Sequence, residues 1–175
     1  EQGFGDAIQF TRFLPRAADR AGALILRAPK ALHPLLAKID ARIALIDDEE
    51  ALPPFVAHCP MMSLPLALGL GDELGSAPYL AADPDRTEAW RQKLGPKTKL
   101  RVGLAWAGRQ SGVINRTRDI PLAALTPLLD QDCEFVCLLK EIPETDRAAL
   151  AERTGLVSFA GELADFGETG ALIAN

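Results

Sequence analysis

Two glycines and an aspartate near the start of the chain form the first segment that could carry chemistry. Gly3 and Gly5 let a backbone turn tightly and approach a ligand closely, and Asp6 follows at the expected start of a helix. A helix N-terminus offers unpaired N–H groups and a partial positive charge. A carboxylate there could act as a base toward a sugar hydroxyl. The structural alternative is that Gly5 makes the turn and Asp6 caps the helix.

Arginines mark the second segment, a polar loop expected over residues 108–119. The loop contains Arg109, Arg116 and Arg118, and guanidinium groups bind phosphate oxygens in a bidentate way. It follows an expected strand and precedes an expected helix, which is where ligands bind in open α/β sheets. The diphosphate of a nucleotide sugar would suit this loop, whereas the alternative is a solvated loop with surface arginines.

Lys140 is the third candidate, because it follows the strand expected over residues 135–139. A lysine at the carboxyl end of that strand faces the same crevice as the arginine loop. It could pair with the same phosphates. The alternative is a lysine whose apolar stem lies along the surface while its amine reaches water.

Histidines and cysteines give a weaker signal. His58 ends an expected strand on the crevice side, whereas His33 is expected at the surface. Two distant histidines and three cysteines without zinc-ligand spacing predict no metal site. Cys133 and Cys137 flank an expected buried strand, so we expect both to pack in a core.

Strands alternate with helices along the first half of the chain. Short apolar runs predict buried strands at residues 23–26, 43–46 and 55–58. Apolar residues at helical spacing predict helices over residues 6–21, 29–38, 61–70 and 84–94. Pro15 lies inside the first of them, so we expect that helix to kink or end early. This alternation predicts right-handed crossovers and a parallel sheet.

A second alternation follows the segment Gly-Pro-Lys-Thr-Lys at residues 95–99, which has the composition of a linker. The expected strands cover residues 101–106, 135–139 and 156–159, and the expected helices cover residues 121–130, 143–154 and 163–175. The chain is therefore predicted to contain two α/β domains, at residues 1–96 and 97–175.

Composition bounds the class of protein. Hydrophobic residues make up 48% of the chain and charged residues 25%, which is typical of an ordinary globular protein. A net charge of −5 gives no broad basic field for nucleic acid or anionic membrane. No apolar run is long enough to span a bilayer. From the charge we expect no nucleic-acid partner. The cysteine usage fits a reducing compartment, so we expect a cytoplasmic protein.

Four motifs in one order resemble a known family. They are EQGFGDAIQF at residues 1–10, HCPMMSLP at 58–65, VGLAWAG at 102–108 and NRTRDIPL at 115–122. Together they look like the glycosyltransferase domain that follows tetratricopeptide repeats in bacterial proteins. That domain is similar to the lipopolysaccharide heptosyltransferases and, more remotely, to O-linked N-acetylglucosamine transferase. The resemblance covers nearly the whole chain.

The resemblance implies a partial glycosyltransferase B fold, in which two Rossmann-like domains bind the acceptor and the nucleotide sugar. No metal or cofactor is expected, because the nucleotide sugar is a substrate. The family places a candidate base at Asp6, with Arg118 and Lys140 toward the donor phosphates. Arg116 and Arg109 complete the expected phosphate-binding set. The expected acceptor or cleft residues are Gly3, Gly5, Gln9 and His58.

The same resemblance also points to an alternative. The family continues past position 175 with a segment that helps to hold the donor, and it carries a strand before position 1. We therefore expect transfer of the sugar to a protein or saccharide hydroxyl by the intact parent protein, with tetratricopeptide repeats beside the domain. The activity of the chain alone stays open. A non-catalytic interaction module associated with the repeats is the alternative.

Overall fold

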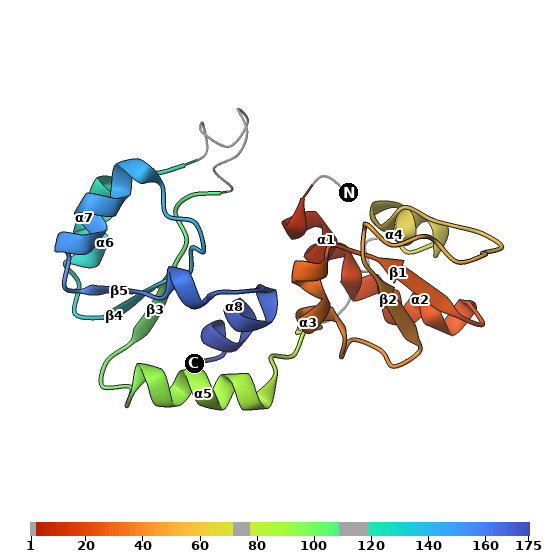
Figure 1. Cartoon of the computed structure of the whole chain (residues 1–175), viewed down its shortest axis with the longest axis horizontal. Coiled ribbons are helices and arrows are strands. Elements are labelled where there is room, and N and C mark those ends of the chain that lie inside the picture. The colour runs from red at the N-terminus through yellow and green to blue at the C-terminus, as the bar shows by residue number, and fades with distance from the viewer. Residues whose placement is uncertain (1–2, 72–77, 109–118) are drawn as a thin grey trace. The chain divides into compact units, whose positions relative to one another are not determined.

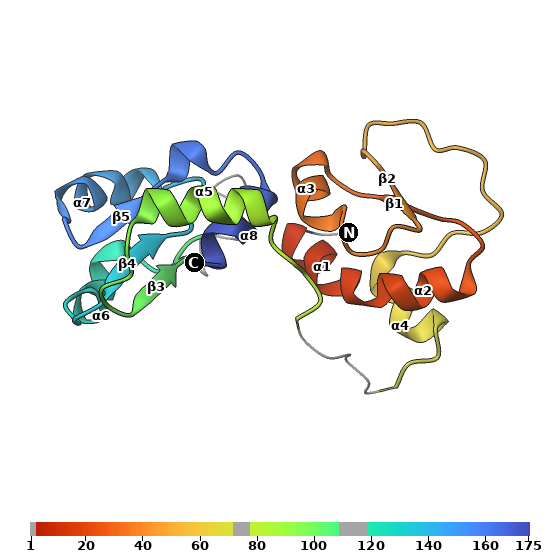
Figure 2. The same cartoon turned by 90° about the horizontal axis from the view of Figure 1, so that it is seen from below.

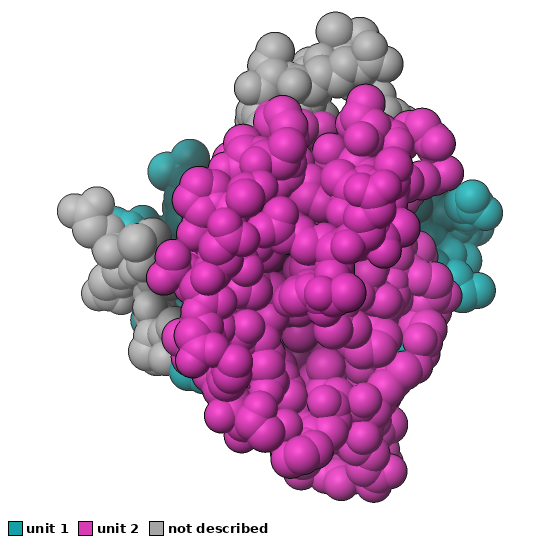
Figure 3. Space-filling model, turned by 90° about the vertical axis from the view of Figure 1, so that its left-hand side faces the viewer, with its two compact units in different colours: residues 1–83, 165–170 teal, residues 84–164, 171–175 magenta. Residues whose placement is uncertain are grey.

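The computed structural model describes residues 3–71, 78–108 and 119–175 of the chain. The chain divides into two compact units, coloured separately in Figure 3. Unit 1 comprises Glu1–Asp83 with Asp165–Gly170, and unit 2 comprises Pro84–Ala164 with Ala171–Asn175. Each unit holds one small parallel sheet (Figure 1).

Unit 1 begins with a helical segment that is interrupted once. Helix α1 (Phe4–Phe10) runs into a 3-10 turn, η1 (Thr11–Phe13), and then into α2 (Leu14–Arg20). Pro15 stands in the first turn of α2. Proline has no N–H group to donate to the preceding turn, so the regular α-helical bonding restarts there. The expected interruption at Pro15 is confirmed.

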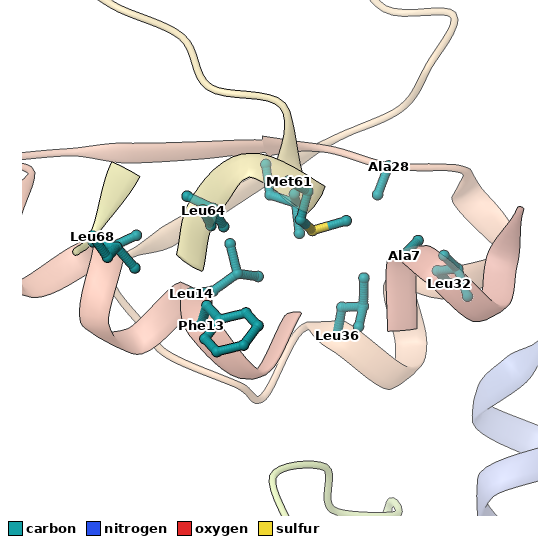
Figure 4. Close-up of a cluster of buried hydrophobic side chains, with 11 residues drawn as sticks. Ala7, Phe13, Leu14, Ala28, Leu32, Leu36, Met61, Leu64 and Leu68 are labelled. Atoms are coloured by element: carbon teal, nitrogen blue, oxygen red, sulfur yellow. The ribbon is translucent and has the colours of Figure 1, made fainter. Parts of the chain in front are cut away.

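The sheet of unit 1 has two parallel strands, β1 (Leu24–Arg27) and β2 (Ile43–Ile46), with Leu24 opposite Ile43. Their crossover consists of η2 (Lys30–Leu32) and α3 (His33–Leu36). Helical side chains on one side of the strands fill the core, as the close-up in Figure 4 shows. Its buried members include Ala7, Phe13, Leu14, Leu26, Leu32, Leu36, Met61, Leu64 and Leu68.

The predicted strand over residues 55–58 is wrong. These residues are irregular in the structure and their side chains are exposed, with Val56 fully open to solvent at 106%. Two prolines, Pro53 and Pro54, precede the segment, and proline cannot donate to a strand ladder. The chain becomes regular again at η3 (Met61–Ser63) and α4 (Leu64–Ala67), where a helix was expected.

The sheet of unit 2 has three parallel strands in the order β3-β4-β5. They are β3 (Arg101–Leu104), β4 (Glu134–Cys137) and β5 (Leu156–Ser158). Arg101 pairs with Glu134 and Phe135 pairs with Leu156. The central strand is the most deeply buried, because helices cover both of its faces.

Helices form a layer on each side of this sheet. Phe135 and Cys137 face a core with Leu122 and Leu129, from η4 (Leu122–Leu125) and α6 (Thr126–Leu129), and α7 (Arg147–Glu152) adds Leu150. Val136 faces a second core, built from α5 (Pro84–Leu94), the 3-10 turn η6 (Ala160–Glu162) with its neighbours, and the last turn of α8 (Phe166–Ile173). Only that last turn, from Ala171 onward, belongs to unit 2. Figures 1 and 2 show α5 on the side of the strands away from α6 and α7.

The compact units divide after Asp83, whereas the sequence placed the domain boundary at Pro96. Helix α5 belongs to unit 2, because Trp90 is buried among Val136, Leu163 and Leu172. The segment expected to be a linker, residues 95–99, lies inside unit 2. There Thr98 donates hydrogen bonds to Glu134 from its backbone N and its Oγ1, at 3.1 and 2.7 Å.

Mixed α/β structure with two small parallel sheets confirms the predicted fold class at that level and is compatible with a Rossmann-like fold. Each parallel pair is joined by a crossover that contains helix, as parallel pairing requires. Among the described residues, no helix combines the length and the apolar character needed to cross a membrane.

Candidate functional site

Three connections leave the second sheet at the same edge. The strands β3, β4 and β5 are parallel, so all three carboxyl ends lie together. Ligands of open parallel sheets bind just outside these ends. This C-terminal edge of unit 2 is therefore the first place to look for a binding site.

The connection after β3 is closed at its base by two hydrogen bonds. The Ile120 N–H donates to the Trp106 carbonyl at 2.9 Å, and the Gly108 N–H donates to Asp119 Oδ1 at 2.9 Å. Residues 106–108 and 119–120 consequently lie side by side at the C-terminal edge. The predicted phosphate ligands Arg109, Arg116 and Arg118 fall between them and lie outside the described residues.

A buried polar contact joins this connection to the next one. Trp106 Nε1 donates a hydrogen bond to Asp146 Oδ2 at 2.8 Å. Asp146 ends the 3-10 turn η5 (Glu144–Asp146), which follows β4. Both side chains are buried, although one carries a carboxyl group. No local pattern indicates this pair, because Asp146 stands among charged residues that are typical of a solvated helix start.

Lys140 also lies at the C-terminal edge, as predicted, three residues after the end of β4. Its side chain is exposed, and its Nζ donates to the Ala164 carbonyl at 2.6 Å. Ala164 belongs to the connection after β5, so this bond links the second and third connections. The acceptor is a neutral carbonyl, and the ammonium charge is not balanced by an ion pair within the described part of the chain.

Asp6 lies half-buried in the first turn of α1, where the sequence placed it. The N-cap residue Gly3 is extended, and no side-chain hydrogen bond caps the helix. Gly5 is helical, and a Cβ atom there would meet nothing within 4 Å. Gln9 is exposed on the same helix. Packing within the fold therefore does not explain a glycine at position 5.

His58 is placed differently from the prediction. With no strand over residues 55–58, it does not stand at the carboxyl end of a strand. Its exposed ring contacts Phe55 edge-on, with ring centroids 5.9 Å apart. A role in an acceptor cleft stays a prediction. His33, expected at the surface, is half-buried, and its Nε2 lies 2.8 Å from the Ala28 carbonyl oxygen.

The candidates thus fall into two sets. Unit 2 brings Lys140 to the edge where the connection with the three arginines begins and ends. Unit 1 holds Gly3, Gly5, Asp6, Gln9 and His58. Cys137 is buried in unit 2, and burial raises the pKa of its thiol. No cluster of three His, Cys, Asp or Glu side chains suited to a metal ion occurs among the described residues.

A hollow of about 210 Å³ lies elsewhere in unit 2, on the sheet face that α8 covers. Its lining is mostly apolar and comprises Arg101, Gly103, Val136, Leu138, Leu172, Ile173 and Asn175. The Arg101 guanidinium is paired with Glu134 at 2.9 Å. Because that charge is already balanced, the hollow offers little to an anionic ligand.

Comparison with models of protein families, with curated proteins and with solved structures finds no match for this chain. The resemblance to the glycosyltransferase domain therefore stays a prediction from the four motifs. What the structure adds is an α/β architecture and an assembled C-terminal edge in unit 2.

Proposed function

We propose that the chain is a glycosyltransferase-type domain that transfers a sugar from a nucleotide sugar to a protein or saccharide hydroxyl. The observation that carries the proposal is the C-terminal edge of unit 2. Both ends of the arginine-containing connection after β3 meet there, and Lys140 follows β4 at the same edge of the sheet. The α/β architecture is compatible with a glycosyltransferase B fold, and the four motifs support that fold in a protein that also carries tetratricopeptide repeats.

Charge is the physical reason for a diphosphate at this edge. Sugar transfer releases a nucleoside diphosphate, on which negative charge develops as the glycosidic bond breaks. Preorganised cations stabilise such charge strongly where water is scarce. Lys140 supplies a point charge, and Arg118 with Arg116 and Arg109 would supply bidentate partners. Lys140 can keep its bond to Ala164, since an ammonium group has three donors.

The acceptor half of the reaction falls to unit 1. A sugar or protein hydroxyl needs a base to take its proton as it attacks. Asp6 is half-buried in the first turn of α1, and its carboxylate is the candidate base for that role. Gly3 and Gly5 keep the backbone beside it free of side chains. Gln9 and His58 are the further acceptor residues in the proposal.

A thermal-shift titration with a panel of nucleoside diphosphates tests the donor site. Ligand at 100 times its Kd stabilises the folded state by about 2.7 kcal/mol, so one diphosphate should raise the Tm clearly. Lys140→Gln and Arg118→Ala should each reduce that shift. Lys97→Gln is the matched control, because it removes the same charge from an exposed residue before β3, at the opposite edge of the sheet.

The thermal shifts of the unchanged protein and the three variants decide whether the diphosphate binds at the C-terminal edge. A shift that falls in the first two variants but not in the Lys97 variant supports the donor site, and transfer assays with the corresponding nucleotide sugar then test the reaction and Asp6→Asn. Equal shifts in all four proteins would place the diphosphate elsewhere. No shift in the chain, and none in the parent protein that contains it, would exclude nucleotide-sugar binding.

One observation favours an interaction module as a second candidate. Exposed apolar side chains follow one another along unit 1 from the segment after the second strand into α4, namely Leu52, Phe55, Val56, Met62 and Leu66. Such surfaces commonly mark protein–protein contacts. If a tetratricopeptide-repeat domain binds the chain, Phe55→Ser with Val56→Ser should abolish the complex and leave the Tm unchanged. Binding that survives these changes would remove this candidate.

A further inference from the structure

Asp146 is the one acidic or basic side chain that is buried within the described part of the chain, at 6% exposure. Its partner Trp106 is 4% exposed, and the indole Nε1 lies 2.8 Å from Asp146 Oδ2. Apolar side chains surround Trp106, among them Leu122, Phe135 and Leu139. A polar group held in such a core would be destabilising without its partner, by about 1–3 kcal/mol. The hydrogen bond therefore fixes how these two side chains face each other.

The main chain at and after Trp106 is hydrogen-bonded to the other end of the same connection. Its carbonyl accepts the Ile120 N–H at 2.9 Å, and two residues later the Gly108 N–H bonds to Asp119 at 2.9 Å. Asp146 is itself fixed, since its N–H donates to the Pro143 carbonyl at 2.9 Å. One carboxylate thus connects the start of α7 with both ends of the connection that follows β3.

We propose that Asp146 is a positioning residue for ligand binding at the C-terminal edge. It acts through Trp106, holding residues 106–108 and 119–120 in the arrangement that a bound diphosphate requires. The inference rests on the proposed function for its ligand, but the arrangement itself can be measured without ligand. Asp146 touches no reacting atom in this role.

Three variants isolate the hydrogen bond. Asp146→Ala removes the acceptor, and Trp106→Phe removes the donor while keeping an aromatic ring in the core. Asp146→Asn keeps an oxygen that can accept from the indole and removes the charge. If this hydrogen bond positions the C-terminal edge, Asp146→Ala and Trp106→Phe should exchange the Ile120 amide faster and bind the diphosphate more weakly. Asp146→Asn should behave like the unchanged protein in both measurements.

Glu134→Gln provides the matched control. Glu134 forms a polar network with Thr98 and Arg101 at the start of β4, at the opposite edge of the same sheet. Loss of that network weakens unit 2 without touching the C-terminal edge. If a measured change reflects only the lower stability of unit 2, it should therefore appear in Glu134→Gln as well.

The first readout is hydrogen exchange at the Ile120 amide, measured relative to the Val136 amide in the middle of β4. Asp146→Ala and Trp106→Phe should raise this ratio about tenfold, which is the effect of losing one hydrogen bond. Asp146→Asn and Glu134→Gln should leave it unchanged. An unchanged ratio in both Ala and Phe variants, or an equal rise in the Glu134 variant, overturns the proposal.

The second readout is the affinity for the nucleoside diphosphate that gives the largest thermal shift. Asp146→Ala should bind it about tenfold more weakly, while Asp146→Asn and Glu134→Gln bind it as the unchanged protein does. Full affinity in Asp146→Ala overturns the positioning role even if the diphosphate binds. If no diphosphate binds the unchanged protein, the role in ligand binding falls with the proposed function, and the exchange ratio alone reports whether Asp146 sets the edge.

Discussion

At Gly5 the backbone is helical and the space where a side chain would lie is empty. Alanine is favoured over glycine within helices by about 0.5–1 kcal/mol. We therefore expect Gly5→Ala to raise the free energy of unfolding by about that amount, as measured by urea denaturation. If an acceptor approaches the backbone here, the same variant should lose transfer activity while gaining stability. A loss of stability would show that the first turn is not helical in solution.

Gly103 stands in the opposite situation. A Cβ atom at this position in β3 would come within 2.7 Å of Leu138 Cδ1, and the residue faces the hollow under α8. Overpacking is destabilising by about 1–3 kcal/mol in a filled core. Here the clashing atom is the end of the Leu138 side chain, which also lines the hollow and can shift into it. We therefore expect Gly103→Ala to lower the free energy of unfolding by about 1 kcal/mol, at the low end of that range.

A double-mutant cycle with Leu138→Ala checks the cause of that loss. Removing the clashing methyl groups should make the Gly103 change nearly neutral in the Leu138→Ala background. If the cost of Gly103→Ala is the same in both backgrounds, contact with Leu138 is not the reason for it; backbone entropy cannot be the reason either, because it favours alanine over glycine in the folded chain.

Among the elements, a proline precedes the start of each of four helical segments. Pro29, Pro60, Pro121 and Pro143 each have φ between −52° and −58° with ψ near 136°, and each is followed directly by a 3-10 turn. An α-helix comes next in every case. The fixed φ of proline suits an extended entry to a helix. For this reason the sequence located these four helical segments correctly.

The stability of the fold at acid pH depends on Glu134, the first residue of β4. Hydrogen bonds from the Thr98 side chain and backbone, then the ion pair with Arg101, lower the pKa of Glu134 from 4.5 to about 2. A depressed carboxyl pKa stabilises the fold above the unfolded value, and this contribution is lost as pH falls from 4.5 toward 2. We expect Glu134→Gln to be less stable at pH 7 and to show a weaker pH dependence in that window.

The measurement is the free energy of unfolding between pH 7 and pH 2, by urea denaturation. Asp132→Asn is a suitable control, because Asp132 pairs with Lys99 at the surface and is 85% exposed. Its profile should follow that of the unchanged protein. Hydrogen bonds from Arg42 lower the pKa of Asp40 to about 2. The stability of unit 1 should therefore also fall at low pH, in all of these proteins alike. Identical profiles for Glu134→Gln and the unchanged protein would contradict the assignment.

At the scale of the whole molecule, each unit has its own sheet and core. Trp90 on α5 is buried in unit 2 and meets the Phe159 ring edge-on at 5.1 Å. Its truncation to alanine should destabilise unit 2 by about 3–5 kcal/mol, because a large cavity is left. Hydrogen exchange should then accelerate in β3, β4 and β5 more than in β1 and β2.

Leu32→Ala, at a fully buried position on the crossover of unit 1, should give the reverse pattern. Equal acceleration in both sheets for either variant would mean that the units unfold as one. The Trp90 variant also tests where α5 belongs. In the structure α5 is part of unit 2, whereas the linker-like composition of residues 95–99 predicted that it belongs to the first domain.

The sequence by itself determined the parts that depend on neighbouring residues. Apolar runs of four to six residues predicted all five strands that the described residues form, helical spacing and prolines predicted the helices, and the alternation predicted parallel pairing. The position of Lys140 just after β4 was predicted because a strand end can be read from a hydrophobic run. The prediction failed at residues 55–58, where an apolar run lies beside prolines and has no partner strand.

Only the tertiary structure decided which distant residues meet. Trp106 and Asp146 are 40 residues apart, and nothing local distinguishes Asp146 from the solvated acids around it. The unit boundary after Asp83 likewise depends on Trp90 reaching Val136 and Leu172. Periodicity reports which side of an element is apolar, whereas burial of a single polar group depends on what packs against it from elsewhere in the chain.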